Sequence, residues 1–263
     1  MTDSEPVLVA RRGRLMTLRL NRPAQRNAID AQMLARIAAA LDAAEADSGV
    51  RTVLIEGNAE VFCTGLDLEA ALAGRGAMDP AAAERGARAY LDVLHRFARS
   101  PKIVACRVSG RCEAGGVGFV AAADFAVADP GATFRLSEAL IGLLPATLMP
   151  FLIRRVGYRT AFRLTLAAPL LGPAEALAAG LVDAAGEGAG EALRHLLLAC
   201  ERVPERTVGA AKAYFDGLAP ITAEIGDYAV GRIASLLADP GAAARIRDLM
   251  AQGVWQAGRG SGA

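Results

Sequence analysis

The sequence is poor in the side chains that build covalent or metal frameworks. It has 4 cysteines and 2 histidines among 263 residues. The cysteines are scattered without CxxC spacing, which predicts neither a disulfide framework nor a zinc site. His95 and His195 are too few to assemble a metal cluster by themselves. We therefore expect no metal site and no resident cofactor.

An excess of charge and a long apolar run are also lacking. The 29 Lys and Arg residues face 28 Asp and Glu residues with no long run of either sign, which argues against nucleic-acid binding. The longest uncharged stretch, 139–153, contains two prolines and is too short to span a membrane. Because the first residues carry acid where a secretory signal needs basic and apolar residues, we expect a soluble, cytoplasmic protein.

Hydrophobic patterning predicts an α/β fold for the first two thirds of the chain. Residues 7–9 and 15–20 alternate as a β-hairpin does, and a helix capped by Asn27 or Asp30 is expected to run to about residue 47. Compact β-rich runs favour four further strands, over 52–56, 102–108, 125–128 and 132–136. Strands that alternate with helices in this way are typical of the α/β class.

Glycine and proline interrupt the segment 70–83, which predicts a mobile surface loop and a candidate lid. A helix that carries Tyr90 is expected after it. Beyond about residue 186 the strand pattern ends, and four helices are expected over 191–203, 206–217, 221–238 and 242–252. The chain therefore divides into a core of residues 1–186 and a C-terminal helical region of residues 187–263, whose Gly-rich end is expected to be disordered.

Two short segments combine a preceding buried strand with small residues: FCTGLDL at 62–68 and GRCEAGG at 110–116. Small side chains let a substrate approach the backbone. Two backbone N–H groups from separate loops can then hold a carbonyl oxygen that becomes an enolate. Ordinary strand-to-helix turns would contain the same glycines, so the pattern alone leaves both interpretations open.

A third glycine pattern, GVGFVA at 116–121, formally satisfies the dinucleotide-binding fingerprint GxGxxA, and Glu138 lies 20 residues beyond Gly118. The preceding strand is expected to end near residue 108, however, so these glycines do not form its immediate turn. We therefore interpret this match as a coincidence.

Four blocks in chain order carry a family resemblance: LNRP at 20–23 with Asn27 and Ala28, FCTGLDL at 62–68, PKIVA at 101–105 with Gly110, and Gly115 with Gly116. Together they resemble the enoyl-CoA hydratase/isomerase (crotonase) family. The resemblance implies a crotonase-type spiral of ββα units, a C-terminal helical region used for trimer formation, and a thioester substrate. It places the substrate's carbonyl oxygen between the N–H groups of Leu66 and Gly115. The substrate-binding residues that it implies are Thr64, Gly65, Asp67, Leu68, Gly116 and Arg26.

The same resemblance identifies a candidate acid and base. Hydratases of this family carry two glutamates, and this chain has Gly118 at the first position and Glu138 at the second. Glu138 is therefore the candidate for proton transfer at the α-carbon and to a leaving hydroxide. A solvated glutamate that caps its own helix is the alternative interpretation. Glu113, in the second loop, is a candidate supplementary acid.

The blocks EAGGVGFV at 113–120 and FRLSEALIGL at 134–143 are most similar to a bacterial branch of the family that works in polyketide β-branching. Members of that branch dehydrate 3-hydroxy-3-methylglutaryl on an acyl carrier protein to 3-methylglutaconyl, so dehydration is the first expectation. The alternatives are an enoyl-CoA hydratase or isomerase of acyl-CoA catabolism, and a non-catalytic acyl-carrier-binding member. The expected partners are an acyl carrier protein or a CoA thioester, in a homotrimer or hexamer.

Other polar side chains leave their roles open. A distal carboxylate on the substrate would need a cation, for which proximity in sequence offers Arg111, Arg135 and Lys102. Four further arginines are interpreted either as a docking face for an acidic carrier or as a salt-bridge surface of a trimer: Arg154, Arg155, Arg159 and Arg163. Cys63 and Cys112 lie in the two loops, where packing is their expected role because no histidine can be tied to them.

Overall fold

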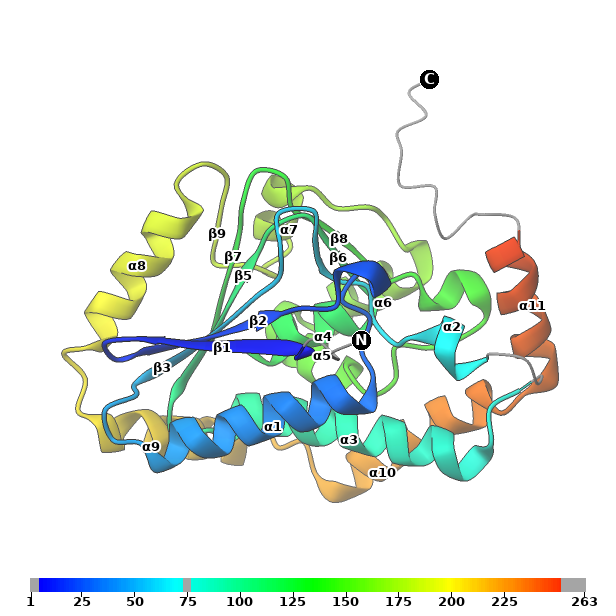
Figure 1. Ribbon diagram of the computed structural model, residues 1–263, viewed down its shortest axis with the longest axis horizontal. Coiled ribbons are helices and arrows are strands. Elements are labelled where there is room, and N and C mark those ends of the chain that lie inside the picture. The colour runs from blue at the N-terminus through cyan, green and yellow to red at the C-terminus, as the bar shows by residue number, and fades with distance from the viewer. Residues whose placement is uncertain (1–4, 73–76, 252–263) are drawn as a thin grey trace.

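A six-stranded sheet forms the centre of the computed structural model, which describes residues 5–72 and 77–251 (Figure 1). The strand order is β1-β2-β3-β5-β7-β9. Strands β1 and β2 form the predicted antiparallel hairpin, and every other neighbouring pair is parallel. The six strands are β1 (Val7–Arg12), β2 (Leu15–Leu20), β3 (Thr52–Glu56), β5 (Ile103–Val108), β7 (Phe125–Ala128) and β9 (Ala184–Ala185).

A second, smaller sheet consists of three short parallel strands in the order β4-β6-β8. These strands are β4 (Val61–Cys63), β6 (Arg111–Glu113) and β8 (Thr133–Arg135). Each follows a strand of the large sheet along the chain, because β4 comes after β3, β6 after β5 and β8 after β7. A helical segment follows each of the three short strands. The predicted α/β class and the spiral of ββα units are therefore confirmed.

The helices belong to two groups. Those before β9 are η1 (Pro23–Gln25), α1 (Ala31–Ala46), α2 (Leu68–Ala71), α3 (Pro80–Arg99), α4 (Gly115–Ala122), η2 (Glu138–Ile141), α5 (Met149–Val156), α6 (Tyr158–Ala167) and α7 (Pro173–Ala178). Those after β9 are α8 (Ala189–Cys200), α9 (Glu205–Leu218), α10 (Ala223–Leu237) and α11 (Pro240–Ala251). The predicted C-terminal helices thus exist, with their ends displaced by a few residues.

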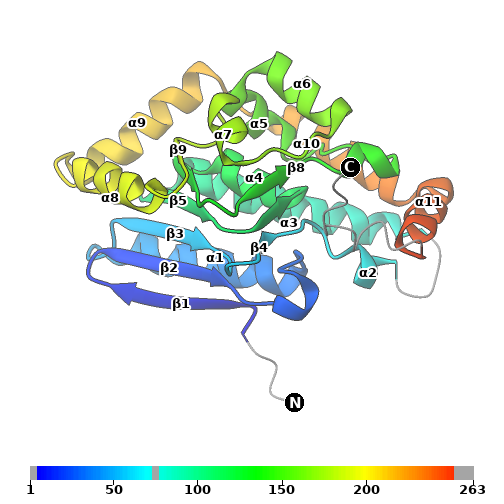
Figure 2. The same ribbon diagram turned by 90° about the horizontal axis from the view of Figure 1, so that it is seen from above.

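Alternating side chains of the large sheet pack on different helices. Leu54, Ala105 and Val127 contact α8, while their neighbours in β3 and β5 join the main core with α1 and α3. This arrangement is visible in Figure 2, where α8 and α1 lie on different sides of the strands. Residues buried on both faces explain why these strands show continuous apolar runs in the sequence.

The start of α1 depends on both predicted cap candidates, in different ways. Asp30 is the N-cap, since its Oδ1 accepts a hydrogen bond from the Met33 N–H at 2.7 Å. Asn27 is buried in a left-handed conformation with φ of 53°, and its side-chain amide donates to the carbonyls of Val61 and Phe62. Asn27 therefore ties the segment before α1 to strand β4.

The loop predicted for residues 70–83 is only partly present. The short helix α2 extends to Ala71, and α3 begins at Pro80 behind the N-cap Asp79. Proline fits the first turn of a helix because its missing N–H would have no partner there. Residues 73–76, the centre of the candidate lid, and the predicted disordered end, 252–263, lie outside the described residues.

Two lysines connect the helices after β9 to the core. The ammonium group of Lys102 lies 2.8 Å from Glu205 at the start of α9, and that of Lys212 lies 2.7 Å from Asp124. Lys212 also donates to the Lys102 carbonyl at 2.9 Å. Charged groups are retained in such surroundings when each has an opposite charge and hydrogen bonds. Within the described part of the chain, no helix is both long enough and apolar enough to cross a membrane.

Candidate active site

The carboxyl ends of the three short strands meet at one edge of the small sheet. FCTGLDL continues from β4, GRCEAGG contains β6, and Glu138 follows β8. A Cβ atom on Gly65 would lie 2.9 Å from the Gly115 nitrogen, so the backbones of the first two loops touch. Gly65 also has a φ of 84°, which other residues rarely adopt. Both reasons explain the glycine at position 65.

The amide of Leu66 points away from the chain that flanks it. Ile29 donates its N–H to the Gly65 carbonyl at 2.7 Å and accepts from the Asp67 N–H at 3.0 Å, so the N–H of Leu66 between them faces the other side. The Gly115 N–H begins helix α4, where first-turn amides have no partner within the helix. Neither amide has an acceptor among the described residues. Two hydrogen-bond donors from separate loops are therefore free beside each other.

Ala114, immediately before the second donor, has a φ of 48° and a ψ of −122°. A side chain with a Cβ atom rarely adopts this conformation, which costs about 1–3 kcal/mol. Its N–H donates to the Arg135 carbonyl at 2.9 Å, and its carbonyl accepts from Val117 at 2.9 Å. These bonds hold the peptide before Gly115 in its strained orientation.

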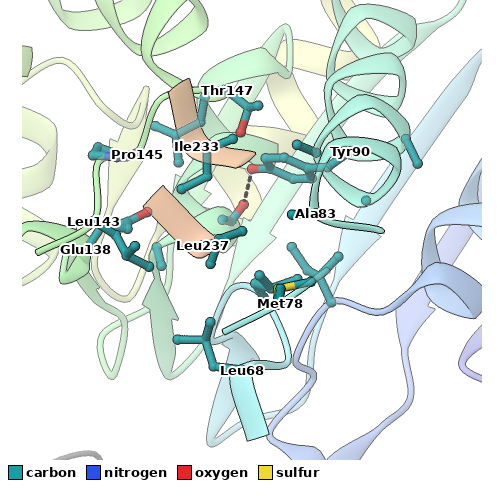
Figure 3. A pocket seen from close by; sticks show the side chains of 18 of the residues that line it. Leu68, Met78, Ala83, Tyr90, Glu138, Leu143, Pro145, Thr147, Ile233 and Leu237 are labelled. Carbon is teal, nitrogen blue, oxygen red and sulfur yellow. Dashed lines mark hydrogen bonds between the residues drawn. The ribbon is translucent and has the colours of Figure 1, made fainter. Parts of the chain in front are cut away.

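The two donors open into a cavity of about 460 Å³ (Figure 3). One side, which we call the strand wall, consists of the segments after β4, β6 and β8, including Leu66, Gly115 and Glu138. The other side, the helix wall, consists of α3 and α10, with Tyr90 and Leu237 among its side chains. Most lining side chains are apolar, as is typical of a site that holds an acyl chain.

Glu138 is the first residue of η2 and brings its carboxylate to this cavity. The Oε2 atom is buried and has no hydrogen-bond partner among the described residues. Burial, which disfavours the charged form, raises the pKa of Glu138 from its ordinary 4.5 to about 7. A hydrogen bond from the residue's own backbone lowers this pKa in part, so the self-capping contact of the alternative interpretation is present, but the carboxylate is buried rather than solvated. It can accept and return a proton near neutral pH.

The other acidic side chain that lines the cavity is Asp30. It already caps α1 and lies 3.0 Å from the guanidinium group of Arg22. Glu113, the candidate supplementary acid, does not line the cavity, because its carboxylate pairs with Arg111 at 2.9 Å on the same face of β6. Among the described carboxylates, Glu138 is thus the cavity-lining one without a cation partner.

None of the three cations predicted for a distal carboxylate lines the cavity. Arg111 is paired with Glu113, Lys102 is paired with Glu205, and Arg135 donates to the Ala168 carbonyl at 2.9 Å. The cation that does line it among the described residues is Arg85 on α3. Its helix was predicted, but the position of this helix over the site was not.

The residues expected to surround the substrate divide into two sets. Those that line the cavity are Thr64, Leu66, Leu68 and Gly115. Those that support the loops from behind are Gly65, Gly116, Asp67 and Arg26. A Cβ atom on Gly116 would lie 2.6 Å from the Cys63 carbonyl, so this glycine permits close packing of α4 on β4. Asp67 caps α2 and lies 3.0 Å from Arg22, and Arg26 lies 3.3 Å from Glu69.

Tyr90 is a residue of the cavity that sequence analysis placed on a helix without a role. Its hydroxyl group donates to the Gly115 carbonyl at 2.5 Å, the bond dashed in Figure 3. A Cβ atom on Gly118 would lie only 1.9 Å from this hydroxyl oxygen. Tyr90 therefore occupies the space into which a side chain at position 118 would extend.

The thiols in the two loops are buried. Burial raises the pKa of Cys63 to about 12 and that of Cys112 well above its ordinary value of 9.0. Protonated thiols are poor nucleophiles, which agrees with packing as their role. No group of three or more His, Cys, Asp or Glu side chains that could hold a metal ion occurs in the part of the chain that the structure describes.

The fold that places these groups at one cavity is that of the enoyl-CoA hydratase-like lyases, as comparison with known proteins shows. The chain belongs to the enoyl-CoA hydratase/isomerase family, whose profile matches residues 11–214. It is 34% identical over 200 residues to the bacillaene synthase dehydratase PksH of Bacillus subtilis, covering 75% of each chain. It is 33% identical over 178 residues to the 2,3-dehydroadipyl-CoA hydratase of Escherichia coli, covering 67% of this chain and 68% of that enzyme.

Solved structures agree with this assignment. The crystal structure of Bacillus subtilis PksH matches with a TM-score of 0.85 and 29% identity over 93% of this chain and 96% of that one. An enoyl-CoA hydratase from Mycobacterium avium matches with a TM-score of 0.82 and 27% identity over 95% of this chain and 97% of that one. The family and the polyketide-type resemblance expected from the sequence are confirmed.

Proposed function

We propose that the chain removes water from a β-hydroxyacyl thioester, converting 3-hydroxy-3-methylglutaryl on an acyl carrier protein to 3-methylglutaconyl. The observation that carries the proposal is the buried, unpaired carboxylate of Glu138 in the cavity that the amides of Leu66 and Gly115 also line. A single acid–base group suits an elimination in which one proton is first removed and then returned.

The steps balance without a cofactor. Glu138 takes the proton from the α-carbon, and the electron pair of that C–H bond moves into an enolate. The N–H groups of Leu66 and Gly115 hold the enolate oxygen, and each such donor contributes about 3–4 kcal/mol to the barrier reduction. The enolate then re-forms the carbonyl as the β C–O bond breaks. Glu138 returns its proton to the departing oxygen, so the products are one water and the unsaturated thioester.

Gly118 separates this site from that of a two-glutamate hydratase. A family hydratase uses a carboxylate at this position together with the second glutamate to hold and activate water. Here the position has no side chain, and the space beside it is filled by Tyr90. One carboxylate therefore handles both protons, and because addition and elimination of water follow the same path, the substrate supplied sets the direction. The Bacillus subtilis relative is itself named a dehydratase of bacillaene synthase, which supports elimination as the working direction.

The carrier and the assembly belong to the same proposal. Of the four arginines considered for carrier docking, Arg154 and Arg155 are paired with Asp216 and Asp183. Arg159 and Arg163 remain the candidates, because they border a surface hollow beside the exposed rings of Tyr158 and Phe162. Exposed apolar side chains of α10 support self-association. We infer a homotrimer or hexamer, which light scattering would test: a monomer at micromolar concentration would contradict it.

Intact-mass measurement tests the reaction. The protein is incubated with 3-hydroxy-3-methylglutaryl on an acyl carrier protein, and the carrier is expected to lose the mass of one water. Glu138→Gln is the matched control and should leave the carrier unchanged. The CoA thioester of the same acid is run in parallel. Faster turnover of an unsaturated CoA thioester would instead favour a catabolic hydratase, as in the Escherichia coli relative. Carrier binding without proton exchange at the α-carbon would identify a non-catalytic member.

A further inference from the structure

We propose that the Tyr90 hydroxyl group binds the β-hydroxyl of the substrate and positions it for departure, a role that rests on the dehydration proposed above. The sequence resemblance gave Tyr90 no part in the reaction. Three features of Tyr90 support this role: the placement of its oxygen atom, the state of its proton and the shape of the neighbouring helix.

Packing holds the Tyr90 side chain in one place. Tyr90 is 8% exposed, and its ring packs edge-on against Phe119 with the centroids 5.7 Å apart. This packing fixes the ring, so that the hydroxyl oxygen lies 2.5 Å from the Gly115 carbonyl, and both Tyr90 and Gly115 line the cavity. The hydroxyl oxygen therefore lies beside one of the two amides expected to hold the thioester oxygen. In Figure 3, Tyr90 and Glu138 reach this cavity from opposite sides.

The Tyr90 hydroxyl group keeps its proton. Burial raises the pKa of Tyr90 well above its ordinary value of 10, so the phenol stays neutral at working pH. Its single proton is committed to the Gly115 carbonyl. The oxygen then has only acceptor capacity left for a ligand. The β-hydroxyl of the proposed substrate is a donor that this acceptor can hold, while the lone pairs of the same hydroxyl stay open to the proton that Glu138 returns.

Position 118 has no room for a side chain. A Cβ atom there would lie 1.9 Å from the Tyr90 oxygen, 3.1 Å from its ring carbon and 2.8 Å from the Leu148 Cβ. Glycine at 118 is therefore required for the hydroxyl to reach its place. The result is a neutral hydrogen-bond acceptor at a place where a carboxylate would act as a second base. A neutral acceptor can hold a hydroxyl group, but it cannot deprotonate an incoming water.

Two reactions separate this role from a purely structural one. Dehydration of the 3-hydroxy-3-methylglutaryl thioester needs the base, the two amides and the held hydroxyl. Exchange of the α-hydrogens of a 3-methylglutaryl thioester in deuterium oxide needs only the base and the amides, because this analogue has no β-hydroxyl. Both reactions are measured on the full chain by mass spectrometry.

Tyr90→Phe is expected to lower the kcat of dehydration at least about tenfold, the worth of one good hydrogen bond, and to leave α-exchange within about twofold. Tyr214→Phe makes the same chemical change on the exposed surface of α9 and should change neither reaction. Thermal unfolding of both variants shows that each remains folded.

The alternatives give different patterns. Equal losses in dehydration and exchange would show that Tyr90 acts only through the Gly115 peptide, and no loss in either would show that it only packs. Either result overturns the proposal. If the unmodified protein exchanges α-hydrogens but does not dehydrate, the proposed function fails instead, because the fault then lies with the substrate and not with Tyr90.

Discussion

The strand wall and the helix wall of the cavity contribute to the site in different ways. The strand wall supplies the backbone donors of Leu66 and Gly115 and the carboxylate of Glu138, all within a few residues of a short strand. The helix wall supplies side chains from α3 and α10, segments more than a hundred residues apart in sequence. The proposed proton chemistry thus depends on the local backbone of one wall, whereas the shape of the cavity depends on long-range packing of the other.

Removing the carboxylate from the strand wall should have the largest effect. Glu138→Gln keeps the shape of the side chain but cannot take a proton, so dehydration is expected to fall roughly a hundredfold to ten-thousandfold. Single-turnover measurement with the carrier-bound substrate checks this. If the variant retains more than a tenth of the activity, a group other than Glu138 removes the proton.

The same variant should gain stability at alkaline pH. Burial raises the folded-state pKa of Glu138 to about 7 from 4.5, so its stabilising contribution is complete below pH 4.5 and is lost as pH rises through 7. The glutamine side chain of the variant does not titrate, and the variant should exceed the wild type by about 3 kcal/mol above that pH. Urea unfolding at pH 5 and pH 8.5 measures the difference. An equal difference at both pH values would contradict the assignment of the shift.

The next largest expected effect is the dependence of the rate of the unmodified protein on pH. The base form of Glu138 must be present in the free protein, so kcat/KM should rise about tenfold per pH unit below 7 and level off above it. At pH 5 the rate is expected to be about a hundredfold lower than on the plateau. A profile that is flat between pH 5 and 8 would show that another group removes the proton.

Close packing behind the strand wall gives a smaller effect. Gly116→Ala places a methyl group 2.6 Å from the Cys63 carbonyl, and the resulting strain should cost about 1–3 kcal/mol. Gly131→Ala is the matched control, because a Cβ atom there would meet nothing within 4 Å. Chemical denaturation of both variants measures the difference. Similar free energies of unfolding for the two variants would mean that α4 can move away from β4 at little cost.

The smallest expected change concerns Ala114. Ala114→Gly relieves a φ of 48° but adds freedom to the unfolded chain, so the two contributions nearly cancel and stability should change by less than about 1 kcal/mol. Ala122→Gly, at the end of the same helix where the backbone is unstrained, should lose about 1 kcal/mol or more. Equal losses in denaturation would show that the strain at Ala114 is not stored in the folded protein.

The two walls also differ in how far the sequence could reveal them. The glycine loops and Glu138 are predictable because their motifs are local and lie on one short stretch each. Of the small sheet that brings them together, only β8 was predicted, as the strand over 132–136, because β4 and β6 are three residues long and show no period. Strand β6 also explains why Arg111 is not free for a substrate carboxylate. Residues two apart in a strand share a face, so Arg111 and Glu113 lie side by side and form an ion pair.

The residues of the helix wall could not be predicted from the sequence for a different reason. Tyr90 falls at helical spacing with apolar residues, which is also how a core residue looks, so its hydroxyl carried no signal. Only the tertiary contact with Gly115 and the vacant side-chain position at Gly118 show what it touches. Arg85 was missed in the same way, because helix packing and not chain proximity brings it to the cavity.

The close approach of Tyr90 to position 118 also constrains how such a site can evolve. A carboxylate at 118 would require the phenol to move, because the first carbon of the new side chain would overlap its oxygen at 1.9 Å. The phenol and a carboxylate at 118 therefore exclude each other in the present arrangement, and substitutions at these two positions should be strongly epistatic.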